Sequence, residues 1–257
     1  IPVGEVVKDS AGNKETITLG RYVFNKNGTI DTALSKTEPG EQLKTSSSAS
    51  DYFTEGLKDS TTSNTHAKDI EDFKNKVNNI THGYYIGRYE SRTSTERKSA
   101  KDELTPITVK SSEYVYNYTT QLQAAELSRK MYSDSNFESD LMNSYAWDTA
   151  IVFLQKFDNR ANKDSLKPYS RQTSLNSSLA SQGTNSLEDT SKQDVICNVY
   201  DMASNCLEWT TETFSSSSTP CTDRGGYYRS SYCTSNRDNF NTPYSPNNIS
   251  FRPLLYM

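Results

Sequence analysis

The hydrophobic positions near the start of the chain fall into two short segments with a polar turn between them. Three valines within residues 3–7 precede the polar residues 9–13 (DSAGN), and the apolar and aromatic residues of 17–24 follow. Two β-prone segments around such a turn predict a β-hairpin. Farther along, residues 83–90 (GYYIGRYE) are aromatic and punctuated by glycine, which predicts another strand.

Three polar stretches interrupt this pattern, at about residues 36–76, 91–112 and 158–194. Ser, Thr, Lys and Asp dominate them, and apolar residues are scarce. We interpret all three as solvated insertions between packed elements, the first with one helical turn around residues 70–77.

The spacing of residues after position 119 predicts a helix. Thr120 and Gln123 have the spacing of a capping box, and Ala124, Leu127 and Met131 then recur at helical intervals.

A second helix is predicted immediately afterwards. Ser135 and Glu138 repeat the capping signal, and residues 141–157 carry a broad apolar face. Such a face belongs either to a partner-binding helix or to a helix packed on its own sheet, and we favour the second interpretation.

The last third of the chain predicts short strands. Residues 195–200 (VICNVY) and 207–212 (LEWTTE) are β-prone, residues 215–219 form a turn, and residues 224–228 return antiparallel. The chain ends in residues 251–256 (FRPLLY). Short strands, long loops and two helices predict an α+β fold.

Composition supports a folded chain despite its polarity. Hydrophobic residues make up only 33% of the 257 residues, and mean hydropathy is −0.82. Disorder at this composition also requires a strong net charge, whereas this chain carries −4. Seventeen Tyr, nine Phe and two Trp supply large rings for a core. We therefore assign residues 1–257 to one domain with long polar loops.

Several classes of function are excluded. The longest aliphatic and aromatic run, residues 150–154 (AIVFL), is too short to span a bilayer. A pI near 5.4 without a Lys/Arg run argues against nucleic acid as a partner. The two His and four Cys lack the spacing of a structural zinc site. Nucleotide-binding glycine loops and the GxSxG motif are also absent.

The surface composition is typical of exported proteins. Ser, Thr and Asn together supply 85 residues. The sequence opens with Ile1 and not with Met, so we expect that a signal, membrane or pilus anchor is missing from the N-terminus. The expected location is extracellular, at a cell surface or on a phage particle.

Four ordered segments resemble the formylglycine-generating enzyme (sulfatase-modifying factor) family, whose fold is a variant of the C-type lectin fold. They are residues 83–90, 198–209 (NVYDMASNCLEW), 224–226 (RGG) and 251–254 (FRPL). Within the second segment Ser204 stands where the family pattern has Gly. The resemblance implies the C-type lectin fold of the formylglycine-generating type.

The same resemblance argues against enzymatic activity. The enzymes of this family hold copper between two cysteines that follow the Gly-Gly pair, because two thiolates bind soft Cu(I). Only Cys233 follows Gly226 here, and the position of its partner falls among Tyr228, Arg229 and Ser230. The related sulfoxide synthases use a His-based iron site, and His66 and His82 both lie outside the matching segments. We therefore expect no catalytic residues, no metal and no cofactor.

A second branch of the fold comprises the variable proteins of diversity-generating retroelements, found in phages and bacteria. In these proteins adenine-directed mutagenesis rewrites selected codons near the C-terminus. The rewritten positions tend to hold Asn, Tyr, Ser, Thr, Asp or Arg and lie between invariant framework residues. Residues 225–257 resemble such a variable region. The resemblance implies a non-enzymatic, receptor-like or adhesin-like protein that recognises a protein or cell-surface partner. Its expected contacts are Tyr228, Arg229, Ser230, Ser231, Tyr232, Thr234, Asn236, Asp238, Asn239, Tyr244, Asn247 and Asn248. Two alternatives remain: a formylglycine-generating-type oxidoreductase, active or degenerate, and a surface adhesin of fixed sequence.

The residues themselves also favour a binding face. Residues 225–257 contain five Tyr, five Asn and five Ser but no Lys or Glu. Binding surfaces favour Tyr, Ser, Asn and Arg over Lys and Glu. The competing interpretation is that these residues only line turns at the end of a sheet.

The cysteines allow no single pairing. A simple hairpin around residues 215–219 places Thr213 opposite Cys221 and Cys206 opposite Tyr228, so Cys206 and Cys221 fall several residues out of register. Cys197 remains a partner for either, and free buried thiols explain all three equally well.

Glu208 and Trp209 suggest an acid beside an indole, but a structural role is favoured. We expect Trp209 in the core and Glu208 paired with Arg224 or Arg252.

Overall fold

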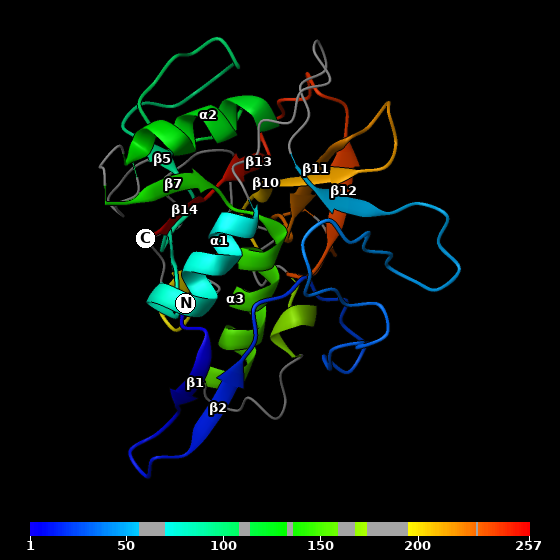
Figure 1. Ribbon diagram of the computed structural model, residues 1–257. Coiled ribbons are helices and arrows are strands. Elements are labelled where there is room, and N and C mark those ends of the chain that lie inside the picture. The colour runs from blue at the N-terminus through cyan, green and yellow to red at the C-terminus, as the bar shows by residue number, and fades with distance from the viewer. Residues whose placement is uncertain (57–69, 108–113, 133–135, 159–167, 174–194, 230) are drawn as a thin grey trace.

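The longest strand, β10 (Leu207–Phe214), organises the main sheet of the protein (Figure 1). The computed structural model describes residues 1–56, 70–107, 114–132, 136–158, 168–173, 195–229 and 231–257. In the main sheet β10 lies between β11 (Cys221–Arg224) and β13 (Ile249–Phe251), and β12 (Arg237–Phe240) pairs with the other edge of β11. β10 and β13 run parallel, whereas β11 and β12 are antiparallel to their neighbours.

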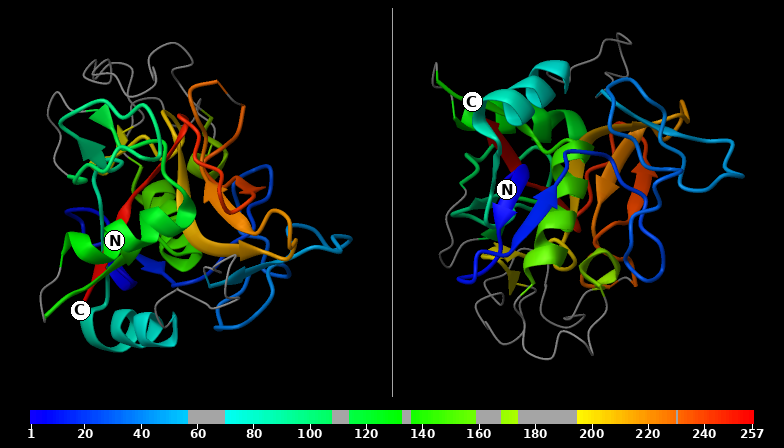
Figure 2. Two further views of the ribbon diagram at one scale, coloured as in Figure 1. Left: turned by 90° about the horizontal axis from the view of Figure 1, so that it is seen from above. Right: turned by 60° about the horizontal axis from the view of Figure 1, so that its bottom comes forward.

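A second sheet brings the end of the chain between two earlier segments. β14 (Pro253–Tyr256) pairs antiparallel with β4 (Tyr85–Ile86) on one side and with β7 (Glu138–Leu141) on the other. The Ile1 amine donates a 2.6 Å hydrogen bond to the Tyr84 carbonyl, so both termini lie beside β4. Both lie away from the edge strand β12 (Figures 1 and 2).

Three hairpins or short pairs complete the strands. β1 (Gly4–Val7) and β2 (Lys14–Ile17) form the predicted N-terminal hairpin. β5 (Arg92–Thr93) pairs with β6 (Tyr114–Val115), and β8 (Val195–Ile196) pairs with β9 (Val199–Tyr200). The described chain therefore has the α+β character that the sequence predicts.

The expected single strand over residues 195–200 is wrong. Cys197 and Asn198 between β8 and β9 have φ of 51° and 62°, both in the left-handed region. Two consecutive residues with positive φ form the tight turn that suits the twist of a hairpin. The segment therefore folds back on itself.

The predicted capping box begins α2 (Gln121–Met131). The Thr120 hydroxyl accepts from the Gln123 amide at 3.2 Å, and the Gln123 side chain accepts from the Thr120 amide at 3.0 Å. α2 packs on β7 and β10.

The second predicted helix starts later than its capping signal indicated. Residues 138–141 form β7, because β14 provides a hydrogen-bonding partner for them. α3 (Ser144–Phe157) begins after Asn143, whose side chain accepts from the Ala146 amide at 2.8 Å. Ser135 lies outside the described residues. α3 packs between the β1–β2 hairpin and the main sheet (Figure 2), so its apolar face is part of the core.

The first predicted insertion is partly core. β3 (Phe53–Glu55) pairs with β10, and α1 (Ile70–Lys76) continues into a π-helical turn, Val77–Thr81. Phe73 is 1% exposed and meets the Tyr84 and Tyr256 rings edge-on. Residues 36–76 therefore contribute a strand and a helix to the fold, and residues 57–69 lie outside the description.

The other two predicted insertions also contain packed residues. In the second, Arg92 and Arg97 are each 3% exposed. Most of residues 158–194 lies outside the described residues, but the short 3₁₀ helix Tyr169–Arg171 buries the Tyr169 ring completely.

Two groups of buried side chains form the core. One surrounds α3 and contains Trp147, and the other lies between α2 and the main sheet and contains Trp209 and Phe251. In the part of the chain that the structure describes, no helix is both long and apolar enough to cross a membrane.

Candidate functional site

The β10–β11 hairpin positions the start of the C-terminal segment. Thr213 pairs with Cys221 as the sequence predicts, but a bulge between Trp209 and Thr213 shifts the register. Trp209 therefore lies opposite Asp223, and the Tyr228 amide reaches the Asn205 carbonyl in place of the predicted pairing with Cys206. All four cysteines are free thiols.

Arg252 ties three of the four motif segments together. Its guanidinium donates to Glu208 at 2.6 and 3.0 Å and to the carbonyls of Gly87 and Tyr200 at 2.7 and 2.8 Å. Of the two partners predicted for Glu208, the structure selects Arg252. Trp209 is completely buried, as predicted.

A second buried carboxyl group, that of Glu90, links the first motif segment to the second. Glu90 accepts hydrogen bonds from the Cys206 amide, at 2.9 Å, and from the Asn205 side chain. Burial, followed by the nearby charge of Glu208, raises the pKa of Glu90 well above its usual range. Every group involved is buried, so these contacts hold residue 90 against the segment 198–209.

An arginine–carboxylate cluster lies beneath the C-terminal segment; it consists of Arg21, Asp148, Glu212, Arg224 and Arg237. Asp148 pairs with Arg224 and with Arg237, each at 2.5 Å. Glu212 pairs with Arg21 at 2.7 Å and with Arg237 at 3.0 Å. Burial alone raises the pKa of Glu212, but the surrounding arginines outweigh it and lower that pKa to about 2. The cluster fastens β10, β11 and β12 to α3.

The Gly-Gly pair sets the direction in which the chain leaves β11. Gly225 has φ of 85°, and a Cβ there would lie 2.5 Å from the Met202 carbonyl oxygen. At Gly226 it would lie 2.6 Å from the Ala203 carbonyl oxygen. Only glycine permits this close approach.

The predicted contact residues divide by exposure. We call residues 227–248, apart from residue 230, the tail face. Arg229, Ser231, Tyr232 and Tyr244 are exposed, and five further residues are half-buried: Asn236, Asp238, Asn239, Asn247 and Asn248. Ser230 lies outside the described residues.

Two predicted contacts are buried, which contradicts their expected exposure. Tyr228 is 6% exposed and packs with Val115 and Cys206. Thr234 is fully buried: its amide donates to the Gln172 carbonyl, and its carbonyl accepts from the Trp147 indole at 3.0 Å. Tyr228 and Thr234 both contact segments that are distant in the sequence, and these contacts fix the loop between β11 and β12.

Asn236 and Asn239 contact other parts of the chain than the exposed tyrosines do. Asn239 alternates with Asp238 along β12 and donates to the Thr219 hydroxyl at 2.8 Å, on the other face of the strand. Asn236 lines a cavity of about 310 Å³ with Arg171 and Cys233. Asn247 accepts from the Asn117 side chain through its carbonyl, at 2.9 Å.

The tyrosines surround two aspartates that face each other across the strands. Asp223 in β11 lies directly opposite Asp238 in β12. The Tyr227 and Tyr232 ring centroids lie 6.3 Å apart. The charge of Asp238 is the largest cause that raises the pKa of Tyr232, while burial and then Asp223 raise that of Tyr244. Sequence analysis missed Asp223, although an acid within a short strand was a usable signal.

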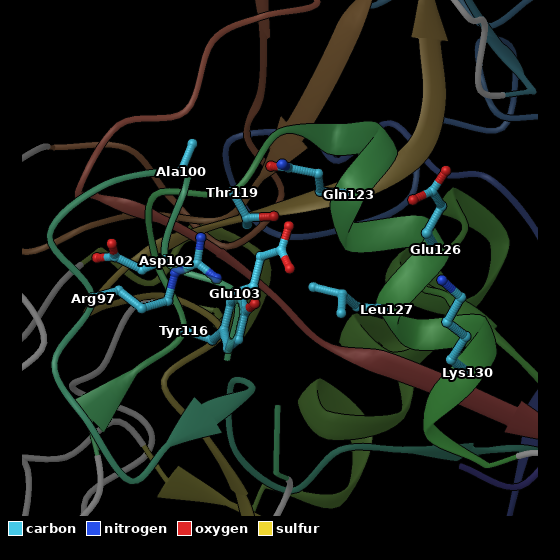
Figure 3. Close-up of a pocket in the computed structure, with 10 residues that line it drawn as sticks. All are labelled: Arg97, Ala100, Asp102, Glu103, Tyr116, Thr119, Gln123, Glu126, Leu127 and Lys130. Atoms are coloured by element: carbon cyan, nitrogen blue, oxygen red, sulfur yellow. The ribbon is translucent and has the colours of Figure 1, made fainter. Parts of the chain in front are cut away.

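A second cavity, of about 320 Å³, lies between α2 and residues 97–103 (Figure 3). On one side of the cavity the Arg97 guanidinium lies over the Tyr116 ring, 3.9 Å from its centroid. Leu127 and Lys130 of α2 line the other side. Arg97 also donates to the Tyr118 carbonyl at 2.9 Å. Sequence analysis missed this cavity, because it treated residues 91–112 as a solvated insertion.

The surroundings of Cys233 do not fit a two-thiolate copper site. Its sulfur lies 3.4 Å from the Ser235 hydroxyl and 3.8 Å from an Arg171 guanidinium nitrogen. A neighbouring cation opposes the binding of Cu(I), and one thiolate supplies half of the ligands such a site requires. Across the described ranges, no group of three or more His, Cys, Asp or Glu residues has the arrangement of a metal site.

Comparison with solved structures finds two similar chains. Treponema denticola variable protein 1 has a TM-score of 0.41 and 13% sequence identity over 66% of this chain and 84% of that one. PvdO from Pseudomonas aeruginosa has a TM-score of 0.42 and 12% identity over 86% of this chain and 99% of that one. No protein-family model and no curated protein matches the sequence.

Proposed function

We propose that this chain is a non-enzymatic variable protein whose tail face recognises a protein or cell-surface partner outside the cell or on a phage particle. The carrying observation is the division between exposed tyrosine and arginine side chains on the tail face and the buried arginine–carboxylate cluster beneath it. Exposed Tyr and Arg provide contact area and hydrogen bonds at small entropic cost.

The separation of exposed side chains from buried ion pairs is also compatible with a binding face whose sequence varies. Arg224 lies at the end of β11 and Arg252 follows β13, and both are completely buried in ion pairs. Because these pairs hold both ends of the tail face, exposed side chains between them are replaceable at little cost in stability. This supports diversification by a retroelement, the finer part of the proposal.

A fixed-sequence adhesin is the nearest alternative. The two differ in the DNA beside the gene: a retroelement requires a reverse transcriptase gene and a near-copy of the 3′ coding region with mismatches at adenines. A single invariant sequence in many isolates of one strain, without that repeat, favours the adhesin.

Replacing Tyr232 or Tyr244 by Ala is expected to weaken binding to the partner by about 1–2 kcal/mol each, as exposed aromatic anchors do. The free energy of unfolding is expected to change by about 0.5 kcal/mol or less for Tyr232→Ala, since Tyr232 is 38% exposed. Tyr244 is 36% exposed, but its ring stacks on Phe240 at 4.4 Å, so Tyr244→Ala is expected to cost about 1 kcal/mol. Flow cytometry of labelled protein on a panel of intact bacterial cells measures binding, and urea unfolding measures stability.

Tyr85→Ala is the matched control, because Tyr85 is 61% exposed on β4, beside the chain termini. Equal loss of cell binding in the control and the two tail variants contradicts the proposed site. If Tyr232→Ala or Tyr244→Ala unfolds the protein, the replaced ring is part of the core and not a binding contact.

The enzymatic alternative is tested by aerobic incubation with Cu(I) and a cysteine-containing sulfatase peptide. No oxidation of the peptide cysteine is expected, because Cys233 lies beside Arg171 and Ser235. Mass spectrometry of the peptide gives the result. Turnover that Cys233→Ser abolishes establishes the oxidoreductase.

A further inference from the structure

An acidic tyrosine patch lies on the tail face; it consists of Tyr227, Tyr232, Asp238 and Tyr244, together with the buried Asp223 of β11 beneath them. The two aspartates are cross-strand neighbours on β11 and β12, so their side chains leave the same face of the sheet. Tyr232 and Tyr244 each interact electrostatically with both aspartates and with Tyr227. Asp238 and the three tyrosines therefore form one surface, with the buried Asp223 beneath it.

The acidic groups of this patch lack a counter-charge within the described chain. Asp223 is completely buried, and neither of its carboxylate oxygens has a hydrogen-bond partner. Burial, followed by the charge of Asp238, raises the pKa of Asp223 well above its usual range. Asp238 is half-buried and accepts from the adjacent Asn239 amide at 2.9 Å. Among the described residues no ion pair to either aspartate is found. A buried polar side chain without a partner is uncommon, because such groups are costly unless they are satisfied.

The arginines on the same two strands do not neutralise the aspartates. Arg224 and Arg237 are cross-strand partners one position along, so their side chains leave the opposite face. There they bind Asp148 and Glu212. No lysine occurs after Lys192 in the sequence. Positive charge for the patch must therefore come from another molecule or from a segment outside the description.

We propose that the acidic tyrosine patch binds a lysine or arginine side chain of a protein partner, with the cation against Asp238, the buried Asp223 beneath it and the tyrosine rings around its stem. This inference rests on the proposed function, and it specifies the chemistry that the tail face recognises. A guanidinium or ammonium group meets both features of the patch. It forms charge-assisted hydrogen bonds with carboxylates and is attracted to the faces of aromatic rings.

Other ligand classes fit the patch less well. A neutral group leaves the two aspartates facing each other without a counter-charge. A bare divalent cation prefers six or more oxygen ligands, and the described residues offer no third acid here. An anion is repelled by both aspartates. Charge complementarity thus favours a basic side chain of a protein.

The test uses the full chain and three fluorescently labelled peptides of equal length, in which Gly alternates with Arg, Lys or citrulline. Citrulline has nearly the shape of Arg but no charge. Fluorescence polarisation at low salt is expected to show binding of the Arg and Lys peptides and at least about ten-fold weaker binding of the citrulline peptide. Binding of the charged peptides is expected to decrease as salt rises.

The variants Asp238→Asn and Asp223→Asn are near-isosteric. Asp238→Asn removes the accessible carboxylate, and Asp223→Asn removes the buried carboxyl group beneath it. Asp238→Asn is expected to weaken the Arg peptide by about ten-fold or more, and Asp223→Asn by a smaller factor, because Asp238 is the more accessible. Glu5→Gln is the matched control: it removes one exposed negative charge from the β1–β2 hairpin and is expected to change binding less than two-fold, or about 0.4 kcal/mol. Thermal melts check that each variant folds.

Three outcomes overturn the inference: the citrulline peptide binds as well as the Arg peptide, Asp238→Asn binds as well as the parent protein, or no charged peptide binds. The comparison with citrulline needs no variant, so it decides the matter even if an Asp variant unfolds. If the peptides fail while Tyr232→Ala and Tyr244→Ala still abolish cell binding, only the inference fails. If cell binding survives those two substitutions as well, the proposed function fails with it.

Discussion

Glu212→Gln is expected to destabilise the protein by about 3–5 kcal/mol, because it leaves buried arginines without their counter-charge. Glu212 is completely buried and holds Arg21 at 2.7 Å and Arg237 at 3.0 Å. Urea unfolding at pH 7 measures the loss. Glu5→Gln is the control: its partner Lys14 is exposed, so the expected change is about 0.5 kcal/mol or less.

The stabilisation that Glu212 provides is expected to decrease as the pH falls. The arginines lower the pKa of Glu212 from 4.5 to about 2 in the folded state. A carboxyl group with a depressed pKa stabilises the fold above its unfolded pKa, and this contribution is lost as pH falls through the folded pKa. A shift of this size corresponds to about 3 kcal/mol.

The stability difference between the parent protein and Glu212→Gln is therefore expected to be full at pH 7, smaller at pH 3 and nearly absent below pH 2. Other buried carboxyls titrate in both proteins, and their effect cancels in the difference. A difference that stays constant down to pH 2 shows that Glu212 does not act through its charge.

Trp209→Ala is expected to cost about 3–5 kcal/mol, the range for removing a buried large aromatic side chain. The Trp209 indole is fully buried, donates to the Thr119 carbonyl at 2.8 Å and meets the Phe240 ring edge-on at 6.1 Å. Alanine leaves a cavity between α2 and the main sheet and also leaves the Thr119 carbonyl without its donor. Urea unfolding measures the cost.

The variant Trp209→Phe separates the cost of the cavity from the cost of the lost hydrogen bond. It keeps most of the buried volume and loses the hydrogen bond, so a smaller loss, about 1–3 kcal/mol, is expected. Tyr232→Ala is the surface control, with an expected change within about 0.5 kcal/mol. A Trp209→Ala variant as stable as that control contradicts the placement of this indole in the core.

Elements that depend on neighbouring residues could be predicted from the sequence. The α2 capping box needs only Thr120 and Gln123, three positions apart, and the structure contains both of its hydrogen bonds. The pairing of Thr213 with Cys221 follows from the turn that residues 215–219 predict, because a simple hairpin around that turn fixes which positions face each other. Trp209 in the core and the pairing of Glu208 with Arg252, one of two predicted partners, were also found.

Elements whose partners are distant in the sequence were predicted wrongly. Residues 138–141 carry a helix-capping signal at Glu138 but pair with the C-terminal strand β14. Residues 53–55 lie in a polar stretch but pair with β10, more than 150 residues later. In both cases a hydrogen-bonding strand outweighs the local preference, which is weak in free energy.

The candidate site shows the same limit. The abundance of Tyr and Asn in residues 225–257 is a local property, and the sequence predicted a binding face from it. Which of these side chains point outward depends on packing. Tyr228 and Thr234 are buried because Val115, Trp147 and Gln172 lie against their loop.

The sequence by itself determined the local features of this protein: the helix α2, the N-terminal and β10–β11 hairpins, and the composition of the tail face. Only the tertiary structure decided which charges meet. Asp148 reaches Arg224 across 76 residues, and Asp223 faces Asp238 only after the loop between β11 and β12 has set the register of these two strands. The physical reason is that burial strengthens or penalises a charge according to its partner in space, and separation along the chain does not specify that partner.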